Sequence, residues 1–264
     1  MTAGTKEFTV TILGSGTAVP SLARSACAVL LTFDDVVLLL DSGPGTMRRL
    51  LEAGFSVFDV THMGISHLHP DHTGELVSFL FANKYPDASL RQQPLTLIGA
   101  KGLTSFYNQL KGIYGEWIDM AGNLKLVEMD NTAPGEKIFS NFLLQTTPVW
   151  HRPESIAFRI NVPNAKSIVY SGDTDVSENL VVLSKDADLL ICEAAFPDEM
   201  KRDGHLTPSL AGKMASRAKV RHLVLTHFYP PCEQADMIGQ CRSTYTGPLE
   251  LAYDLLSFNM DEQA

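Results

Sequence analysis

The segment ISHLHPDHTGE, residues 65–75, places three of the chain's eight histidines and one aspartate within six positions: His67, His69, Asp71 and His72. Imidazole and carboxylate groups are ligands that suit Zn²⁺, Mn²⁺ or iron. Because His67 and His69 are two positions apart, an extended chain directs both side chains to the same side, where they can bind one ion. Pro70 is expected to turn the chain, so that the next two ligands can face a second ion. The segment therefore predicts a large part of a two-metal site.

Three more polar residues follow apolar runs elsewhere in the chain. His151 follows FLLQTTPVW, Asp173 follows SIVYSG, and His227 follows HLVLT. Loops at strand ends are where sites are usually built, so we expect these residues to join the first four. Seven ligands, one of them a bridging carboxylate, suffice for two ions that each keep a position for water, which is typical of catalytic sites. His62 and His222 are isolated, and we interpret them as ordinary turn residues.

The elements that must position these residues alternate between strand and helix. Apolar runs predict strands over residues 8–16, 26–33, 36–43, 62–67, 94–100, 141–151, 155–162, 167–174, 187–194 and 221–227. Helical spacing predicts helices over 44–54, 74–84, 101–120, 177–185 and 207–219, the last with Thr207 as N-cap and Pro208 in its first turn. The run 248–258 closes the chain. We therefore expect a single α/β domain over residues 1–264, built from two β-rich halves with helices outside.

Composition and charge exclude several classes of function. The chain has 264 residues, of which 45% are hydrophobic and 19% charged, as in an ordinary soluble globular protein. No apolar run approaches the roughly 20 residues that span a membrane, and the N-terminus lacks the pattern of a signal peptide. Four widely spaced cysteines without a CxxC pair favour a reducing cytoplasm. A formal net charge of −9 disfavours extended nucleic-acid binding, although a metal-lined pocket for one phosphate remains compatible with it.

Taken together, these motifs resemble the metallo-β-lactamase superfamily. The resemblance rests on HLHPDH, on the strand-end His151, on SGDT with Asp173 and on LTH with His227. The segments LGSGTAVPS, AYDLL and CEAAF…GHLTPSLAGKMA are similar to the ribonuclease Z-like branch. The resemblance runs nearly from end to end and implies a four-layer αββα sandwich. It says less about the substrate, because this fold hosts many hydrolases.

The resemblance also implies a role for each candidate residue. His67, His69 and His151 would hold one zinc ion, Asp71, His72 and His227 would hold the second, and Asp173 would bridge both. His205 would lie beside the ions, oriented by Glu193, so that Asp71, His205 and Glu193 are the candidate catalytic residues. Paired ions keep such a pocket positive in an acidic protein and lower the pKa of a bridging water toward neutrality, which yields a hydroxide nucleophile. His205 could then protonate the leaving oxygen or bind a phosphoryl oxygen.

The sequence departs from the ribonuclease Z pattern in three places. Residues 152–172, where many tRNA-trimming enzymes carry a long arm, are filled by two predicted strands, so extended tRNA binding is not expected. The HEAT signature reads Cys192-Glu193-Ala194-Ala195, which keeps only the acid and one alanine. The HST signature reads His205-Leu206-Thr207, and an apolar residue there suggests a drier pocket and a smaller or more apolar substrate.

The segment 100–122 admits three interpretations. It brings together Phe106, Tyr107, Tyr114, Trp117 and Met120. Such residues pack on a core, cover a site as a lid, or form a dimer contact, where aromatic residues and methionine are enriched.

The leading hypothesis is a dinuclear zinc-dependent phosphodiesterase of the ribonuclease Z-like type, with Mn²⁺ or iron as other possible ions. Its substrate would be a small phosphodiester or an RNA end. The alternative is a lactonase, an esterase or a β-lactamase-like enzyme, since the same ions can open those substrates too. A binding or sensing protein would be expected to have lost a ligand, and all seven positions are filled. The resemblance further implies a homodimer. The cysteines predict a cytoplasmic protein, and the short apolar runs predict no membrane partner.

Overall fold

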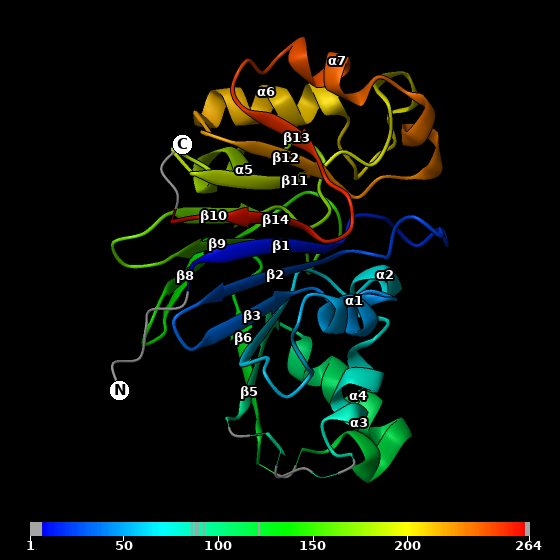
Figure 1. Cartoon of the computed structure of the whole chain (residues 1–264), viewed down its shortest axis with the longest axis vertical. Helices are drawn as coiled ribbons and strands as arrows, with labels where there is room; N and C mark the ends of the chain where they lie inside the picture. The colour runs from blue at the N-terminus through cyan, green and yellow to red at the C-terminus, as the bar shows by residue number, and fades with distance from the viewer. Residues whose placement is uncertain (1–6, 86, 88–89, 92, 121, 262–264) are drawn as a thin grey trace.

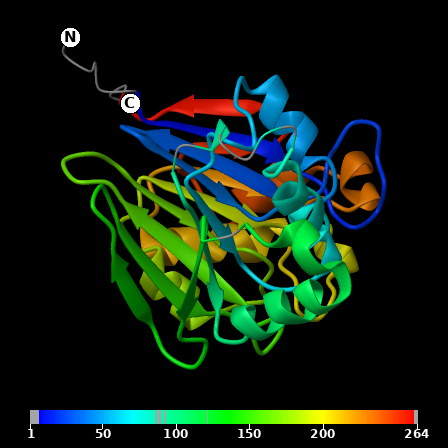
Figure 2. The same cartoon turned by 90° about the horizontal axis from the view of Figure 1, so that it is seen from below.

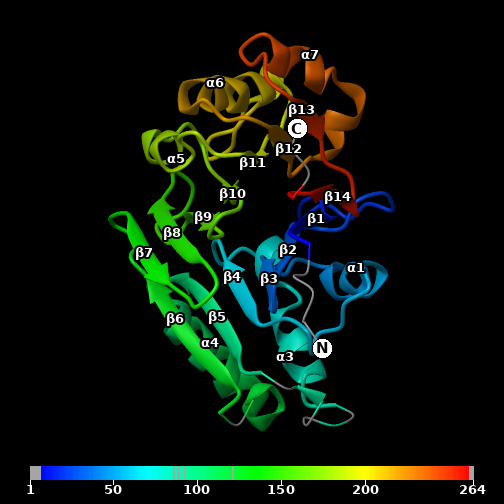
Figure 3. The same ribbon diagram turned by 60° about the vertical axis from the view of Figure 1, so that its left-hand side comes forward.

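In a computed structural model, which describes residues 7–85, 87, 90–91, 93–120 and 122–261, two β-sheets lie face to face with helices on their outer sides (Figure 1). The first sheet has the order β14-β1-β2-β3-β4-β5-β6 and the second the order β13-β12-β11-β10-β9-β8-β7. Figure 3 shows the sheets from the side, with α3 and α4 outside the first and α6 outside the second. The prediction of a four-layer αββα sandwich is therefore confirmed.

The first sheet combines strands from both ends of the chain. It consists of β1 (Thr9–Gly14), β2 (Ala28–Phe33), β3 (Val36–Leu40), β4 (His62–Ile65), β5 (Leu95–Ala100), β6 (Leu124–Met129) and β14 (Leu256–Asn259). Strands β14, β1, β2 and β3 pair antiparallel, whereas β3, β4, β5 and β6 pair parallel. The β2–β3 hairpin turns at Asp34, whose φ is 46°.

The second sheet is built from the later part of the chain. It consists of β7 (Gly135–Ile138), β8 (Leu143–Pro148), β9 (Ile156–Asn161), β10 (Ser167–Tyr170), β11 (Leu189–Glu193), β12 (Leu223–Thr226) and β13 (Leu249–Leu251). Strands β7 to β10 pair antiparallel, and β10 to β13 pair parallel.

The helices cover the outer faces. Those on the first sheet's side are α1 (Thr46–Glu52), α2 (Pro70–Thr73), α3 (Leu76–Ala82), α4 (Leu103–Tyr114) and the 3₁₀ helix η2 (Gly115–Ile118). Those of the second half are α5 (Glu178–Leu183), η3 (Asp198–Met200), α6 (Pro208–Ala218), η4 (Pro230–Gln234) and α7 (Met237–Arg242). Seen from below, the cyan and green helices gather on one side of the blue strands (Figure 2). No helix among the described residues has the length and apolarity needed to cross a membrane.

Strand β2 explains why the runs of the first sheet are continuously apolar. Val29 and Leu31 belong to the apolar cluster between the two sheets. Ala28 and Leu30 belong to a second cluster, between the first sheet and its helices. Because successive side chains of a strand point to opposite faces, a strand covered on both sides must be apolar at every position.

Several elements differ from the sequence-based expectation. Strands β6 and β7 were not predicted, because LKLVEM and GEKI carry charged, exposed residues that the two edge positions tolerate. The closing run 248–258 is two strands, β13 and β14, which belong to different sheets. Helix α7 was also not predicted. Pro70 does not merely turn the chain but begins the short helix α2.

Candidate metal centre

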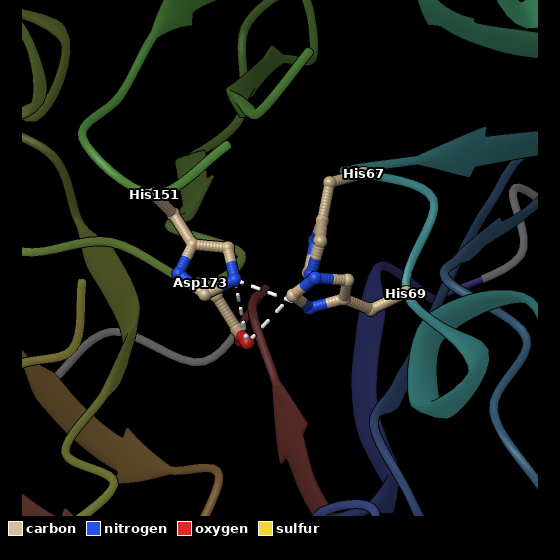
Figure 4. A group of neighbouring side chains, drawn as sticks. All are labelled: His67, His69, His151 and Asp173. Carbon is tan, nitrogen blue, oxygen red and sulfur yellow. Dashed lines mark hydrogen bonds and ion pairs between the residues drawn. The ribbon is translucent and has the colours of Figure 1, made fainter. Parts of the chain in front are cut away.

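The seven predicted ligands converge at one edge of the sandwich. His67 follows β4 by two residues, His151 follows β8, Asp173 follows β10, and His227 comes directly after β12. Figure 4 shows His67 and His69 entering from one side and His151 and Asp173 from the other, with nitrogen and oxygen atoms facing one another. Strand ends from both sheets meet here, so residues that are far apart in the sequence become neighbours.

Three of the histidines form what we call the outer group: His67, His69 and His151. His69 Nδ1 and His151 Nε2 are 3.2 Å apart. One donor atom from each of these histidines and one from Asp173 all lie within 4.8 Å of one another, a spacing that can accommodate a metal ion. His67 is buried, while the other two are partly exposed. This arrangement brings together the ligands predicted for one ion.

Asp71, His72 and His227 form the inner group. The first two lie on α2, and His227 has a left-handed backbone with φ 61°. Asp71 Oδ2 lies 3.5 Å from His227 Nε2 and 3.9 Å from His72 Nε2. All three residues are buried. The inner group therefore brings together the ligands predicted for the second ion.

The two carboxylate oxygens of Asp173 face the two groups separately. Oδ2 lies 3.7 Å from His67 Nε2 and 3.7 Å from His151 Nε2. Oδ1 lies 3.2 Å from His72 Nε2 and 3.3 Å from His227 Nε2. A carboxylate so placed has one oxygen for each of two ions.

Several of the converging atoms have no hydrogen-bond partner. Among the described residues, buried atoms without one include Nε2 of His67, Nε2 of His72, Oδ1 of Asp173 and both ring nitrogens of His227. An unpaired buried polar atom costs about 1–3 kcal/mol, so a cluster of them is unfavourable unless another group completes it. Imidazole and carboxylate donors at this spacing fit divalent metal ions.

Asp41 supports the inner group and was not predicted from the sequence. It is fully buried directly after β3, with φ 62°, and its Oδ2 lies 2.7 Å from His72 Nδ1. It also accepts hydrogen bonds from Tyr170 Oη and from the backbone and side chain of Ser66. Such a contact fixes the tautomer and orientation of a ligating histidine. The signal that could have identified it is an acid directly after a wholly apolar strand, the same context that singled out Asp173.

Charges around the inner group set its protonation. Burial disfavours charge on His72, but Asp173 and Asp41 outweigh burial and raise the pKa of His72 well above its usual value. Burial likewise disfavours ionised Asp71, but the neighbouring imidazoles of His227 and His72 outweigh burial and lower the pKa of Asp71 to about 2. Asp71 therefore stays ionised at neutral pH, as a metal ligand must.

The outer group is held by neutral partners. His151 Nδ1 donates to the carbonyl of Gly204 at 2.8 Å, and His67 Nδ1 lies 3.1 Å from Ser66 Oγ. Burial and the neighbouring His72 lower the pKa of His67 well below its usual value, and burial also lowers the pKa of His151. Neutral imidazole is the form that binds metals.

His205 and Glu193 form a pair beside the cluster. His205 Nδ1 and Glu193 Oε1 are 3.0 Å apart, and the His205 ring stacks near that of His227, with centroids 5.6 Å apart. Glu193 is buried and accepts backbone N–H groups of Thr174 and Leu206. Burial disfavours a charged His205, but the hydrogen bond to Glu193 outweighs it and raises the pKa of His205. The pair is therefore arranged to keep a proton on His205 next to the ligands.

Leu206 does not line a dry pocket, contrary to the sequence-based expectation. Its side chain is fully buried and belongs to the larger apolar cluster of the core. Its backbone N–H donates to Glu193 Oε2, 3.1 Å away. The HLT segment therefore positions Glu193 through its backbone and gives no information about the substrate. Thr207 precedes α6 but makes no capping hydrogen bond with its side chain.

The segment 100–122, apart from residue 121, which lies outside the described residues, serves more than one purpose. Tyr107 and Met120 are buried in the core, which fits the packing interpretation. Trp117 is 57% exposed. Its ring packs against those of Phe81, in α3, and Tyr85, which follows that helix. Helix α4 lies outside the first sheet (Figure 3). The exposed aromatic residues therefore form a surface on the outer layer.

The two histidines expected to be ordinary residues lie outside the cluster. His62 packs edge-on against Phe139 and Phe142. His222 contacts Glu250 at 3.2 Å and packs against Phe258. Neither contributes to the ligand groups formed by the described residues.

A protein-family comparison decides the family. The model of the anti-Pycsar protein Apyc1 family matches residues 8–236, which is most of the chain and includes all seven predicted ligands. The chain belongs to the anti-Pycsar Apyc1 family. Its members are named for an anti-Pycsar role.

Relatives and solved structures agree on the fold and on the class of enzyme. The metallo-β-lactamase fold protein YhfI from Bacillus subtilis superposes with a TM-score of 0.81 at 20% identity, covering 96% of this chain and all of that one. The short form of human tRNase Z superposes with a TM-score of 0.77 at 26% identity, covering 96% of this chain and 99% of that one. Ribonuclease Z from Methanothermobacter thermautotrophicus is 27% identical over 295 aligned positions, covering 94% of this chain and 95% of that enzyme.

These likenesses confirm two predictions. The chain has the metallo-β-lactamase fold, and it is similar to ribonuclease Z enzymes, among them the short form of human tRNase Z. It is a metal-dependent hydrolase, with clustered histidines and aspartates that suit a divalent ion.

Proposed function

We propose that this protein is a dinuclear zinc-dependent phosphodiesterase that acts on a small phosphodiester. The observation that carries the proposal is the division of Asp173 between the groups, with Oδ2 toward His67 and His151 and Oδ1 toward His72 and His227. His67, His69 and His151 would hold one ion, and Asp71, His72 and His227 the other. The fold is proposed to act as one hydrolase domain over residues 1–264.

When bound, the two ions would supply Lewis acidity and a water activated at neutral pH. The chain supplies everything else. Asp41 holds His72, and the carbonyl of Gly204 holds His151, so ligand rings are already oriented. The buried walls exclude bulk water from the ligand side of the cluster, which strengthens the electrostatic interactions inside it.

His205 is proposed to give a proton to the leaving oxygen. Its Nδ1 is hydrogen-bonded to Glu193, so Nε2 remains available to the substrate. Glu193 is in turn fixed by backbone N–H groups on both sides, from Thr174 next to Asp173 and from Leu206 next to His205. One buried carboxylate thus sets the position of His205 relative to Asp173. A phosphodiester needs such a donor, because its leaving alkoxide is a poor leaving group without one.

The chain's shape and charge support a small substrate. All of the residues 152–172 are described, and they hold β9 and β10 joined by a short connection rather than an arm. The net charge of −9 also disfavours a long polyanion. We therefore favour a mononucleotide-sized phosphodiester, cyclic or linear, over tRNA.

The family description names an anti-Pycsar role, and we extend it to this chain as part of the same proposal. Hydrolysis of a small phosphodiester would be the chemical means of that role. Cells that carry a Pycsar system should lose its effect when this protein is expressed, and the Asp173→Asn variant should not have this effect. If both proteins acted equally, hydrolysis would not be the means.

A substrate panel tests the reaction type. Purified protein loaded with Zn²⁺ is offered bis-p-nitrophenyl phosphate, cyclic mononucleotides, a short RNA, a lactone and nitrocefin. We expect turnover of the small phosphodiesters and little of the others. Turnover of the lactone or nitrocefin alone would reject the phosphodiesterase in favour of the alternative hydrolases.

Metal analysis tests the cofactor. The proposal expects two zinc ions per chain, loss of activity on chelation and recovery with Zn²⁺, with Mn²⁺ or iron as weaker substitutes. Activity that survives complete chelation would reject the mechanism.

We further propose a homodimer in the cytoplasm. The four cysteines are unpaired and buried, as suits a reducing compartment. The exposed aromatic residues Phe81, Tyr85 and Trp117 offer an apolar contact for a second copy. Light scattering should give twice the chain mass, and Trp117→Ser should shift it toward the monomer. A native monomer would reject the dimer.

A further inference from the structure

Cys27 lies beside the inner group, and the proposed function gives it no role. It directly precedes β2, is 2% exposed, and donates a hydrogen bond from Sγ to the carbonyl of Gly16 at 3.3 Å. Its Sγ and one ring nitrogen each of His72 and His227 lie within 4.8 Å of one another, a spacing that can accommodate an ion. The sulfur therefore lies within reach of the same space as two of the inner ligands.

The unpartnered nitrogens of the two inner histidines provide a second observation. Nε2 of His72 and Nε2 of His227 are buried and have no hydrogen-bond partner. Both face Asp71 and Asp173. Buried donor atoms without partners indicate a polar space that the protein's own atoms leave incomplete, and the sulfur of Cys27 lies within reach of these two histidines.

We propose that Cys27 supplies a thiolate ligand to the ion of the inner group, which would then be bound by nitrogen, oxygen and sulfur. On binding, the thiol loses its proton to solvent and gives up its hydrogen bond to Gly16, and the metal–sulfur bond replaces it. Thiolate is a soft ligand, so the inner position would favour Zn²⁺, Co²⁺ or Cd²⁺ over Mn²⁺ and Mg²⁺. The outer group, with imidazoles and one carboxylate oxygen, would lack this preference.

This inference rests on the proposed function, because it assumes an ion at the inner group. It goes further in assigning a different donor set, and therefore a different metal preference, to each of the two positions. The opposing interpretation is that Cys27 is a packed thiol that keeps its bond to Gly16 when the ions bind.

Cobalt spectroscopy distinguishes Cys27 as a metal ligand from Cys27 as a packed thiol. Metal-free full-length protein is loaded with two equivalents of Co²⁺ and its absorption recorded. A thiolate bound to Co²⁺ adds an intense near-ultraviolet charge-transfer band to the weak visible bands that nitrogen and oxygen ligands give. The other cysteines, Cys192, Cys232 and Cys241, belong to none of the ligand groups among the described residues, so the band would report Cys27. Visible bands without the charge-transfer band in the native protein would overturn the proposal, and no variant is needed for that result.

Matched variants complete the test. Cys27→Ser should remove the charge-transfer band while leaving visible cobalt bands, and it should weaken the binding of one Zn²⁺ by about tenfold to a hundredfold. Cys241→Ser, which changes a buried cysteine of α7, should leave band and affinity unchanged. A band that survives in Cys27→Ser would overturn the assignment.

The outcome also separates the two proposals. Hydrolysis of a phosphodiester by protein that holds two ions but has no thiolate band would reject Cys27 as a ligand and leave the proposed function standing. Failure to bind two ions at all would reject both.

Discussion

The outer and inner groups use similar ligands but differ in their surroundings. The outer group has two partly exposed histidines and neutral supports, a carbonyl and a hydroxyl. The inner group is buried throughout, includes the carboxylate of Asp71 and is backed by a second carboxylate, Asp41. Because opposite charges interact more strongly away from water, the inner group should hold a cation more tightly. Two positions joined by one aspartate can therefore differ in affinity although both bind through imidazoles.

Because the two positions differ in burial and charge, we expect their ions to have different roles. A tightly held inner ion would keep the structure of the site, while the more accessible outer ion would be the one that exchanges. His205 lies close to both groups. The centroid of its ring is 4.9 Å from that of His151, in the outer group, and 5.6 Å from that of His227, in the inner group. The five predictions below test this comparison, beginning with the change that affects both groups.

Asp173→Asn removes the residue that the groups share. The amide keeps the shape but loses the charge that both groups face, so we expect fewer than two ions per chain. If the ions no longer stabilise the transition state by about 4 kcal/mol, kcat/KM falls by about a thousandfold. Elemental analysis and the phosphodiesterase assay measure both effects. Full occupancy with full activity would show that Asp173 is not the bridge.

Mild chelation should remove the ions in two stages. The outer ion is expected to leave first, because its ligands are more exposed and its group contributes no carboxylate of its own. Activity should disappear with this first ion, since a two-metal mechanism needs both. Dialysis against increasing concentrations of chelator, with zinc content and activity measured at each step, would detect the two stages. A single step for both ions would contradict the comparison.

Asp41→Asn weakens the support of the inner group. The amide nitrogen cannot accept the hydrogen bonds that Oδ1 or Oδ2 accepts from Ser66, Tyr170 and His72. We expect zinc affinity to fall by about tenfold to a hundredfold at one position. Calorimetric titration of the metal-free protein would measure this.

Asp175→Asn is the matched change at the outer group. Asp175 Oδ2 accepts from the backbone N–H of Gly204 and from Lys201, and thereby holds the loop whose carbonyl orients His151. The outer ion should lose less than about tenfold in affinity, because the carbonyl itself remains. Equal losses in both variants would mean that the two groups do not differ in the way described.

Glu193→Gln should have the smallest effect, a shift in pH dependence. The charge of Glu193 raises the pKa of His205, so removing it lowers that pKa. A general acid works only while protonated, so the loss of activity on the alkaline side should move to a lower pH. The pH profile of kcat/KM measures the shift, and His205→Gln should remove this limb altogether. An unchanged profile in Glu193→Gln would mean that the pair does not set the protonation of His205.

Most of the fold was predictable because its signals are local. At most one threonine interrupts the apolar runs of β2, β3, β5 and β11. Gly54 and Pro208 stand at the ends of helices, where such residues belong. Strands β6 and β7 were missed because an edge strand needs little apolar character. The fate of the run 248–258 was missed because its division between two sheets depends on pairing with β1 and β12, which lie far away in the sequence.

In the candidate site too, local signals were predictable and contacts between distant segments were not. HLHPDH was recognisable because four candidate ligands, three histidines and one aspartate, stand within six positions. Asp41 was not, because one acid after one strand is common, and only its distance of 2.7 Å from His72 gives it a role. Leu206 was misinterpreted for the opposite reason: its neighbour in sequence is His205, but its side chain points into the core.

The sequence by itself determined the two-sheet architecture, the ligand types and their family, because periodicity and short-range spacing are written along the chain. Only the tertiary structure decided which ligands face which oxygen of Asp173, that Asp41 supports His72, and that Cys27 lies against the inner group. These are relations between strand ends that are remote in sequence, and the packing of two sheets brings them together. Asp41 and His227 even adopt left-handed backbones, at a cost of about 1 kcal/mol each, which only their surroundings in the folded protein can offset.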